Sequence, residues 1–229
     1  MWCIVPAAGI GSRFGSNIPK QYSEIFQGIT VLEYTLSKLI EFPRFEGIMV
    51  AIHQDDKYWN SLPISRHQKI FTCLGGSERS DSVRQALKNI SNRFNISKNE
   101  WVMVHDAARP GITKILLEKL YLEVNQSTEC GGILATRIAD TIKSGLNGQV
   151  VKTIDRGNLW AAQTPQMFGL NQLLIALEKA AHDGFPVTDE ASAIEALGYK
   201  PVLVESNASN FKITTQLDLV IMREMLRSS

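Results

Sequence analysis

The residues best suited to chemistry begin in the segment VPAAGIGSRFGSNIPKQY, which runs from Val5 to Tyr22. Backbone N–H groups of a glycine-rich loop can approach phosphate oxygens because no Cβ blocks them. Arg13 could hold two phosphate oxygens with its guanidinium, and Lys20 could act as a mobile positive charge. Two such cations suit a reaction in which negative charge grows on phosphorus and on a pyrophosphate leaving group. From the loop alone, nucleotide binding and a plain surface turn both stay open.

Two familiar glycine motifs do not fit this loop. A dinucleotide fingerprint needs G-x-G-x-x-G at the opening of a helix. Gly9 and Gly11 are spaced for it, but Gly15 comes one residue late, and the loop continues through Pro19 and Lys20 instead of entering a helix. A Walker A loop fails as well, because no G-K-[ST] follows at the required spacing.

Two further segments offer groups that could complete a nucleotide site. In GGSERSDS, residues 75–82, a planar base could lie against the paired glycines while Ser77 and Ser82 read its edge. In VHDAARP, Asp106 closes an apolar run, where a carboxylate could meet magnesium-bound phosphates or a sugar hydroxyl, and Arg109 follows within one turn.

Each of these residues also has a structural interpretation. Ser80 or Asp81 is expected to cap the helix that follows, and Arg79 could be an ordinary surface charge. Asp106 and Arg109 could pair only with each other. His105 is expected to be a packed, hydrogen-bonded histidine and not a catalytic base.

The elements that must position these residues alternate between strand and helix. Apolar, β-branched runs predict strands over residues 2–8, 47–53, 69–74, 100–106, 131–136 and 200–205. Helical spacing of apolar residues predicts helices over residues 30–42, 80–90, 113–124, 169–184, 189–198 and 215–226. This order and the continuously apolar strands favour an α/β fold with a mostly parallel sheet that helices cover on both faces. Ligands of such sheets lie beyond the carboxyl ends of strands, where all three segments fall.

Residues 137–158 break this alternation. RIADTIKS and GQVVKTID flank GLNG, and Asn147-Gly148 is a strong signal for a β-hairpin. Neither strand has a wholly apolar face, and an isolated hairpin is marginal in water, so it must pack on something. A second copy of the chain and the hairpin's own domain are both open. We expect one domain, residues 1–229, with residues 137–158 as an arm within it.

Composition and charge narrow the class of protein. The 229 residues are 44% hydrophobic and 21% charged, with a formal net charge of +1, so no basic field argues for nucleic acid. Three scattered cysteines without a CxxC pair suggest a reducing compartment. No apolar run is long enough for a membrane span, and the start of the chain does not have the pattern of a signal peptide, so we expect a cytoplasmic location.

In combination the motifs resemble the family of 2-C-methyl-D-erythritol 4-phosphate cytidylyltransferases. The segments that carry the resemblance are VPAAGIGSRF…PKQY, GGSERSDSV, VHDAARP, ADTIK, IDRGNLWAAQTPQMF, TDEASAIEALG and NFKIT, which span Val5 to Thr214. The resemblance implies a Rossmann-like, nucleotidyltransferase-type fold with a protruding β-hairpin arm. It also implies a magnesium-dependent transfer of a cytidylyl group from CTP to methylerythritol 4-phosphate, in non-mevalonate isoprenoid biosynthesis.

The resemblance further implies roles for individual residues. Arg13 and Lys20 would stabilise the transition state, with Arg156 and Lys212 as further catalytic cations. The residues implied around CTP are Ala7, Ala8, Gly9, Gly76, Ser77 and Ser82. Those implied near the acceptor are Asp106, Arg109, Thr141, Thr164 and Thr188. The arm of one subunit would reach into the other, so that Thr141 and Arg156 act across a homodimer. Magnesium would be held mainly by the CTP phosphates.

Three other functions are weighed against this one. A ribitol 5-phosphate cytidylyltransferase shares the scaffold, but such enzymes tend to open with paired glycines where this chain has Ala7-Ala8. A dinucleotide-dependent oxidoreductase is disfavoured by the late third glycine and by Lys20. A non-catalytic nucleotide-binding regulator is disfavoured because Arg13 and Lys20 are both present.

Overall fold

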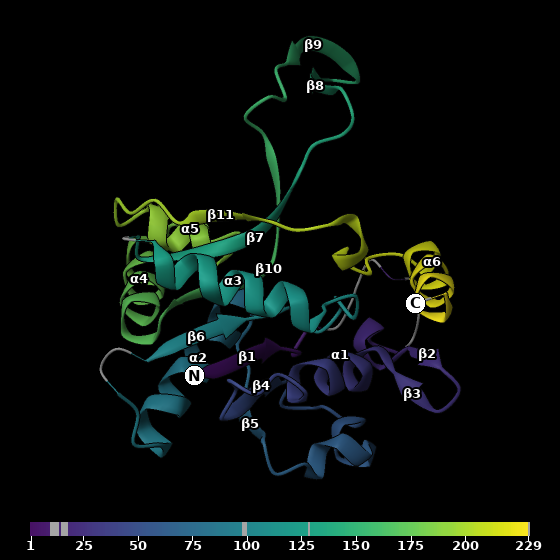
Figure 1. The fold of residues 1–229 in the computed structure, drawn as a ribbon, viewed down its shortest axis with the longest axis vertical. Helices are drawn as coiled ribbons and strands as arrows, with labels where there is room; N and C mark the ends of the chain where they lie inside the picture. The colour runs from purple at the N-terminus through teal and green to yellow at the C-terminus, as the bar shows by residue number, and fades with distance from the viewer. Residues whose placement is uncertain (10–13, 15–17, 98–99, 128, 229) are drawn as a thin grey trace.

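The centre of the molecule is a mostly parallel β-sheet (Figure 1). The computed structural model describes residues 1–9, 14, 18–97, 100–127 and 129–228. In this part of the chain seven strands form the main sheet in the order β11-β7-β10-β6-β1-β4-β5. They are β1 (Trp2–Pro6), β4 (Gly47–Ile52), β5 (Ile70–Leu74), β6 (Trp101–Val104), β7 (Gly131–Arg137), β10 (Trp160–Gly169) and β11 (Val202–Glu205). Only β10 runs antiparallel to its neighbours, so the predicted α/β class is confirmed.

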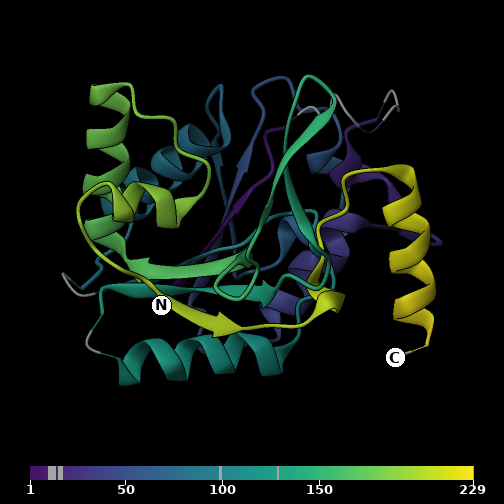
Figure 2. The same cartoon turned by 90° about the horizontal axis from the view of Figure 1, so that it is seen from above.

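Helices cover both faces of the sheet because its central strands are apolar on both sides (Figure 2). In β1, Cys3 and Val5 pack into one core, and Trp2 and Ile4 pack into the other, as the two-residue period of a strand requires. The first core includes α1 (Val31–Ile40) and α3 (Lys114–Gln126). The second includes α2 (Arg79–Arg93), α4 (Leu170–Asp183) and α5 (Glu190–Glu195).

The C-terminal helix belongs to a smaller third core. α6 (Gln216–Arg227) packs against β2 (Glu24–Phe26), which pairs with β3 (Ile29–Thr30) in a short hairpin. Phe14 is buried in the same cluster, beside Ala108 and Ile213. This cluster therefore ties the glycine-rich opening segment to the C-terminal segment. The remaining short elements are 3-10 helices: η1 (Lys20–Tyr22), η2 (Trp59–Ser61), η3 (Pro63–Arg66) and η4 (Ala208–Asn210).

Strand β10 is the main element that the sequence does not reveal. Its middle reads Gln163-Thr164-Pro165-Gln166, and the Thr164–Pro165 peptide bond is cis. Its pairing with β7 shifts register between Ala162 and Gln166. A proline cannot donate to a ladder and normally argues against a central strand, so an irregular strand of this kind has no alternating pattern to detect.

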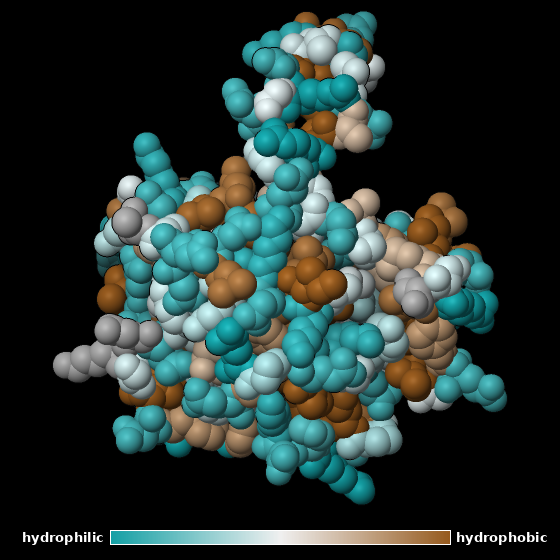
Figure 3. Space-filling view, viewed as in Figure 1, coloured by the Kyte–Doolittle hydropathy of each residue, from teal (hydrophilic) through white to brown (hydrophobic). Residues whose placement is uncertain are grey.

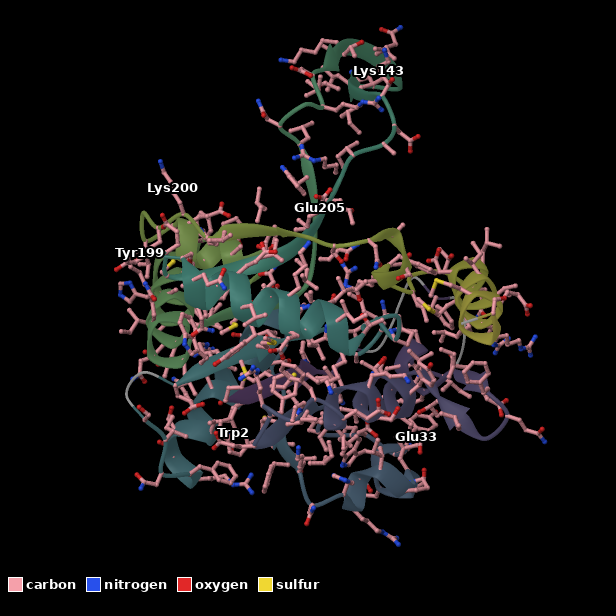
Figure 4. The ribbon with its side chains drawn as sticks, viewed as in Figure 1. Trp2, Glu33, Lys143, Tyr199, Lys200 and Glu205 are labelled. Atoms are coloured by element: carbon pink, nitrogen blue, oxygen red, sulfur yellow. The ribbon has the colours of Figure 1, made fainter. Side chains whose placement is uncertain are left out.

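The predicted hairpin is present as β8 (Ile142–Leu146) and β9 (Gln149–Ile154). Asn147 and Gly148 form its turn with φ of 50° and 78°, the left-handed pair that a two-residue hairpin turn requires. The hairpin stands clear of the body on the extended ends of β7 and β10 (Figures 1 and 3). Lys143 marks its head, far from Trp2 in the sheet (Figure 4).

Candidate nucleotide and phosphate site

The opening loop is fixed where it leaves β1. The Ala7 N–H donates to the Ala51 carbonyl at 2.8 Å, which continues the β1–β4 pairing. The buried Gln21 amide donates from Nε2 to the Ala7 carbonyl at 2.8 Å and to the Gly9 carbonyl at 2.9 Å. Because Gln21 occupies these carbonyls from one side, the backbone of residues 7–9 has a defined shape at the edge of the pocket.

One predicted cation of this loop can be placed. Lys20 starts η1, and its Nζ donates to the Ile213 carbonyl at 3.0 Å, next to Lys212 in the chain. This bond joins residues that are 193 positions apart, and it holds Lys20 beside the segment that carries Lys212. Arg13 lies outside the described residues.

The glycine-serine turn packs directly against the opening loop. A Cβ on Gly75 would lie 2.5 Å from the Ala8 Cβ and 2.8 Å from the Ser82 Oγ, so the two backbones meet at this point. The buried Ser82 hydroxyl accepts from the Gly76 N–H at 3.1 Å and donates to the Glu78 carbonyl at 3.1 Å. These bonds close the turn on the first residues of α2.

The prediction that Ser80 or Asp81 caps this helix is wrong. α2 begins at Arg79 after Glu78, whose side chain makes no capping bond, and Ser80 and Asp81 lie inside the helix. Asp81 instead accepts from the Ser77 hydroxyl at 2.9 Å and pairs with the side chain of Arg84 at 2.8 Å. The Ser82 hydroxyl closes the turn at residues 76–78, and α2 begins at Arg79 without a side-chain cap.

Asp106 is the centre of the charge network. It is 6% exposed, and its Oδ1 accepts from the Arg79 Nε at 2.8 Å. Its Oδ2 contacts the Lys212 Nζ at 2.9 Å and the Arg109 Nε at 3.4 Å. Burial alone would raise the pKa of Asp106, but the three cations outweigh burial and hold that pKa well below its ordinary value. Asp106 is therefore a carboxylate at neutral pH, and the pairing of Asp106 with Arg109 alone is excluded.

His105 has the structural role that was predicted for it. It is fully buried, its Nε2 lies 3.0 Å from the Arg109 carbonyl, and its Nδ1 lies 3.1 Å from the Thr164 hydroxyl. Burial lowers the pKa of His105 to about 4, so the ring is neutral at pH 7. Because a carbonyl can only accept, Nε2 carries the proton, and the Thr164 hydroxyl donates to Nδ1. The same hydroxyl accepts from the Asp106 N–H at 3.0 Å.

These segments enclose a pocket of about 420 Å³ at the carboxyl end of β1. The predicted residues that line it are Ala7, Ala8, Gly9, Lys20, Gly76, Ser77, Ser82, Asp106 and Lys212. All six residues predicted around CTP are thus brought together, with two of the predicted cations. The pocket is also lined by residues that were not assigned to a site: Pro6, Phe14, Gln21, Glu78, Arg79, Ala107, Ala108 and Thr214.

The other predicted residues lie outside the pocket wall. Arg109 donates from Nη1 to the Asn210 carbonyl at 2.8 Å, and Thr164, whose hydroxyl accepts from the Asp106 N–H, is 4% exposed. Thr188 is exposed at the start of the α5 segment. Thr141 and Arg156 are exposed residues of the arm, and neither lines the pocket.

Arg79 and Glu190 are the functional candidates that sequence reasoning did not find. Arg79 lines the pocket and is no ordinary surface charge, because it bonds both Asp106 and the fully buried Glu190. Glu190 belongs to the helix predicted over residues 189–198, and it begins α5, with Asp189 as the N-cap. The available signal is the motif TDEASAIEAL, in which Glu190 falls on the same helical face as Ala193 and Ile194.

The described residues do not include a preformed metal centre. Among them, no three His, Cys, Asp or Glu side chains are grouped so as to hold a metal ion. The carboxylates at the pocket are Asp106, already engaged by three cations, and the exposed Glu78. This donor set fits a cation that arrives bound to a polyphosphate better than a resident metal, because Mg²⁺ keeps several waters and few protein carboxylates. Within the same residues, no helix is long and apolar enough to cross a membrane.

Comparison with known proteins places the chain in a family. The family model described as 2-C-methyl-D-erythritol 4-phosphate cytidylyltransferase matches residues 1–228. The enzyme of that name from Vibrio atlanticus is 44% identical over 218 residues, with 95% of this chain and 91% of the relative covered. That from Hahella chejuensis is 42% identical over 228 residues, with 99% and 93% covered.

Solved structures agree in fold. The Francisella tularensis 2-C-methyl-D-erythritol 4-phosphate cytidylyltransferase matches with a TM-score of 0.83 at 42% identity, covering 96% of each chain. The enzyme of the same name from Thermus thermophilus matches with a TM-score of 0.80 at 27% identity, covering 98% of each. With the fold, the pocket and these matches together, the chain belongs to the 2-C-methyl-D-erythritol 4-phosphate cytidylyltransferase family.

Proposed function

We infer that this protein transfers a cytidylyl group from CTP to 2-C-methyl-D-erythritol 4-phosphate in isoprenoid precursor biosynthesis. A phosphate oxygen of the acceptor attacks the α-phosphorus of CTP. The bond between that phosphorus and the oxygen that bridges it to the β-phosphorus breaks, and pyrophosphate leaves with that oxygen. The products are 4-diphosphocytidyl-2-C-methyl-D-erythritol and pyrophosphate. The observation that carries the inference is the family match over residues 1–228 in a chain whose predicted nucleotide residues line one pocket.

The pocket suits a pyrimidine nucleotide. The backbone of residues 7–9 and the turn at Gly76 and Ser77 offer polar main-chain groups at close range, and Ser82 fixes the turn. We assign Ala7, Ala8, Gly9, Gly76, Ser77 and Ser82 to CTP. The volume of about 420 Å³ is in the range of small-molecule sites.

Electrostatics explain the cations around the pocket. The reaction brings the acceptor phosphate to an α-phosphorus already surrounded by negative charge, and repulsion between the two anions is the main obstacle. Lys20 and Lys212 line the pocket, and we assign them, with Arg13, to stabilising that charge. We assign Asp106 and Thr188 to the acceptor side, with Arg109 and Thr164 acting there through their bonds to Asp106. Asp106 is already held where a sugar hydroxyl could bond it.

Magnesium is proposed as the cofactor, carried in by CTP. Bound to the triphosphate, it would supply positive charge at the phosphates, with Asp106 as the buried pocket carboxylate best placed nearby. EDTA should abolish pyrophosphate release and added Mg²⁺ should restore it. Full activity in EDTA would contradict the proposal.

A homodimer through the arm is proposed as well. The arm stands off the body and exposes Leu146, Val150 and Val151, which a partner could cover (Figure 3). Thr141 and Arg156 would then reach the partner's pocket. Lys20→Ala and Arg156→Ala variants, each nearly inactive alone, should regain up to a quarter of the activity when mixed, because one hybrid site in such a dimer is intact. No recovery despite proven subunit exchange would exclude an arm that acts in trans.

The substrate assignment is tested by pyrophosphate release with Mg²⁺ and each pair of substrates. CTP with methylerythritol 4-phosphate should be preferred over UTP and ATP, and over ribitol 5-phosphate as acceptor. A preference for ribitol 5-phosphate would move the protein to the alditol branch, and binding of NADH without CTP would revive the oxidoreductase. Because CTP and sugar phosphates are cytoplasmic metabolites, we also propose a cytoplasmic location, which fractionation of cells would test.

A further inference from the structure

A buried ion pair lies directly behind the wall of the pocket. Glu190 is 0% exposed, and its two carboxylate oxygens accept from the Arg79 Nη1 at 2.7 Å and Nη2 at 3.1 Å. The third nitrogen of the same guanidinium, Nε, donates to the Asp106 Oδ1 at 2.8 Å. Arg79 lines the pocket, whereas Glu190 does not. One arginine therefore connects a fully buried glutamate to the carboxylate at the centre of the site.

Glu190 is held rigidly from the other side. Asp189 caps α5 in a reciprocal capping box, with its Oδ1 accepting from the Ser192 N–H at 2.9 Å. The buried Gln166 of β10 donates from Nε2 to the Asp189 Oδ2 at 2.8 Å, and its Oε1 accepts from the Ala191 N–H at 2.9 Å. The first turn of α5 is thereby fixed to the sheet on both sides of Glu190. Its carboxylate has a fixed position toward which Arg79 must orient.

The energetics of this ion pair indicate that it orients side chains and adds little to the stability of the fold. Desolvation of a buried carboxylate and a guanidinium offsets most of their attraction, and apolar residues of similar volume often stabilise a fold as well or better. A bidentate arginine, however, fixes the plane and direction of its remaining donor. With Oδ1 of Asp106 taken by that donor, Oδ2 is left for Lys212 at 2.9 Å and Arg109 at 3.4 Å.

We propose that Arg79 and Glu190 are positioning residues for the proposed cytidylyl transfer. Glu190 orients Arg79, Arg79 orients the Asp106 carboxylate, and Asp106 in turn places the Lys212 ammonium at the pocket. Neither residue of the pair exchanges a proton or forms a bond to the substrates in this role. The proposal rests on the proposed function for its kinetic readout only.

Two kinds of substitution test the proposal. Arg79→Lys keeps the charge but loses the planar fork that bonds both Glu190 oxygens while Nε bonds Asp106, and Glu190→Gln keeps the shape but removes the counter-charge. Each should lower kcat/KM of cytidylyl transfer by about 10- to 100-fold, since small misplacements of a site cost that much. The double substitution Arg79→Met with Glu190→Leu removes the pair without leaving a buried charge, so it should fold but remain as impaired. A double variant that folds and keeps kcat/KM within about threefold of the wild type would overturn the proposal.

A second readout does not depend on turnover. The groups that face Asp106 are Arg79, Arg109, Lys212 and the neutral His105, so the loss of Arg79 contact removes one of three favourable charges. The Asp106 carboxylate, assigned in ¹³C NMR spectra by Asp106→Asn, should stay ionised at low pH in the wild type and titrate at higher pH in Arg79→Met with Glu190→Leu. An unchanged titration in that folded variant would refute the positioning role. If the wild type made no pyrophosphate, this titration would still decide the role of the pair, and only the proposed function would fail.

The surface pair Arg44–Glu118 provides a matched control. Its guanidinium also contacts both carboxylate oxygens, from Nε at 3.1 Å and from Nη2 at 2.6 Å, but it does not line the nucleotide pocket. Arg44→Lys and Glu118→Gln should leave both kcat/KM and the Asp106 titration unchanged. A loss from these variants equal to that from the Arg79 and Glu190 variants would show a general effect of ion-pair removal, and the proposal would fall.

Discussion

The Asp106 cluster and the hairpin arm handle polar residues in opposite ways. In the cluster, one buried carboxylate is shared by Arg79, Arg109 and Lys212, from three separate parts of the chain. On the arm, the exposed Arg156 side chain makes no hydrogen bond or ion pair to any residue that the structure describes. The contacts of the cluster lie within one chain, whereas the arm carries polar groups and apolar surface that its own chain leaves uncovered.

The two regions differ in how much their polar contacts contribute to the stability of the folded chain. Low dielectric makes each contact of the cluster strong and makes loss of a partner costly. Exposed groups on a two-stranded hairpin gain little from local contacts and are free to bind elsewhere. We therefore expect substitutions in the cluster to change stability and chemistry, and substitutions in the arm to leave the stability of the body unchanged.

The largest effect should come from Asp106→Ala. It leaves three cations without their shared buried partner, so the free energy of unfolding should fall by about 3–5 kcal/mol. Urea denaturation followed by fluorescence measures this change. Asp155→Ala in the arm removes a carboxylate whose Oδ1 accepts from the Gly157 N–H at 3.0 Å, and it should leave that free energy almost unchanged. Equal losses from both variants would end the distinction between cluster and arm.

Lys20→Ala should separate chemistry from stability. The lysine lines the pocket and its Nζ donates to the Ile213 main-chain carbonyl, so the fold should persist while pyrophosphate release falls by about 10²–10³-fold. Initial rates with CTP and Mg²⁺, beside circular dichroism of the same sample, give both quantities. Lys88→Ala, which removes an exposed ion pair between α2 and Glu178 of α4, is the control and should keep both rate and fold. A near-normal rate for Lys20→Ala would remove the loop's assigned role.

Next in size is a pH effect at His105. Its pKa in the folded protein is lowered to about 4 by burial, below the unfolded value of about 6.5. The folded state thus binds fewer protons than the unfolded state in this window, so His105 contributes stability above pH ~6.5 that is lost as the pH falls toward ~4. Imidazole ¹⁵N shifts, assigned with His105→Gln, should show a neutral Nε2–H ring at pH 6. A titration midpoint of the His105 imidazole between pH 6 and 7 would contradict a buried, hydrogen-bonded ring.

The smallest predicted difference between arm and body is in the free energy of unfolding after two glycine substitutions. Gly148→Ala on the arm meets no atom within 4 Å but adopts φ of 78°, which should cost about 1 kcal/mol within the hairpin. Gly47→Ala in β4 would drive a Cβ into the Trp2 ring and should cost about 1–3 kcal/mol through overpacking. Thermal unfolding of the body should detect only the second change. A lower melting temperature for Gly148→Ala, at a concentration where the protein is monomeric, would show that arm and body unfold together.

Most of the framework follows from local patterns in the chain. The six predicted helices and six predicted strands of the sheet are present, because periods of 3.6 and 2 record which side faces the core. The Asn147-Gly148 turn is equally local, since its left-handed φ values suit few other residues. Strand β10 and the start of α2 escaped this reasoning. A cis proline and a register shift hide the first, and a serine hydroxyl that bonds its own turn replaces the expected cap of the second.

The sequence alone determined the parallel α/β order and the placement of three reactive segments at the carboxyl ends of strands. Residue types and their periods of 2 and 3.6 predict the strands and helices. Because parallel strands run in one direction, their carboxyl ends share one edge of the sheet. Only the tertiary structure decided that Lys212 and Arg79 meet at Asp106, and that Glu190 holds Arg79 from 111 residues away. Partner choice in a buried ion network depends on distances across the packed core, and no spacing along the chain encodes those distances.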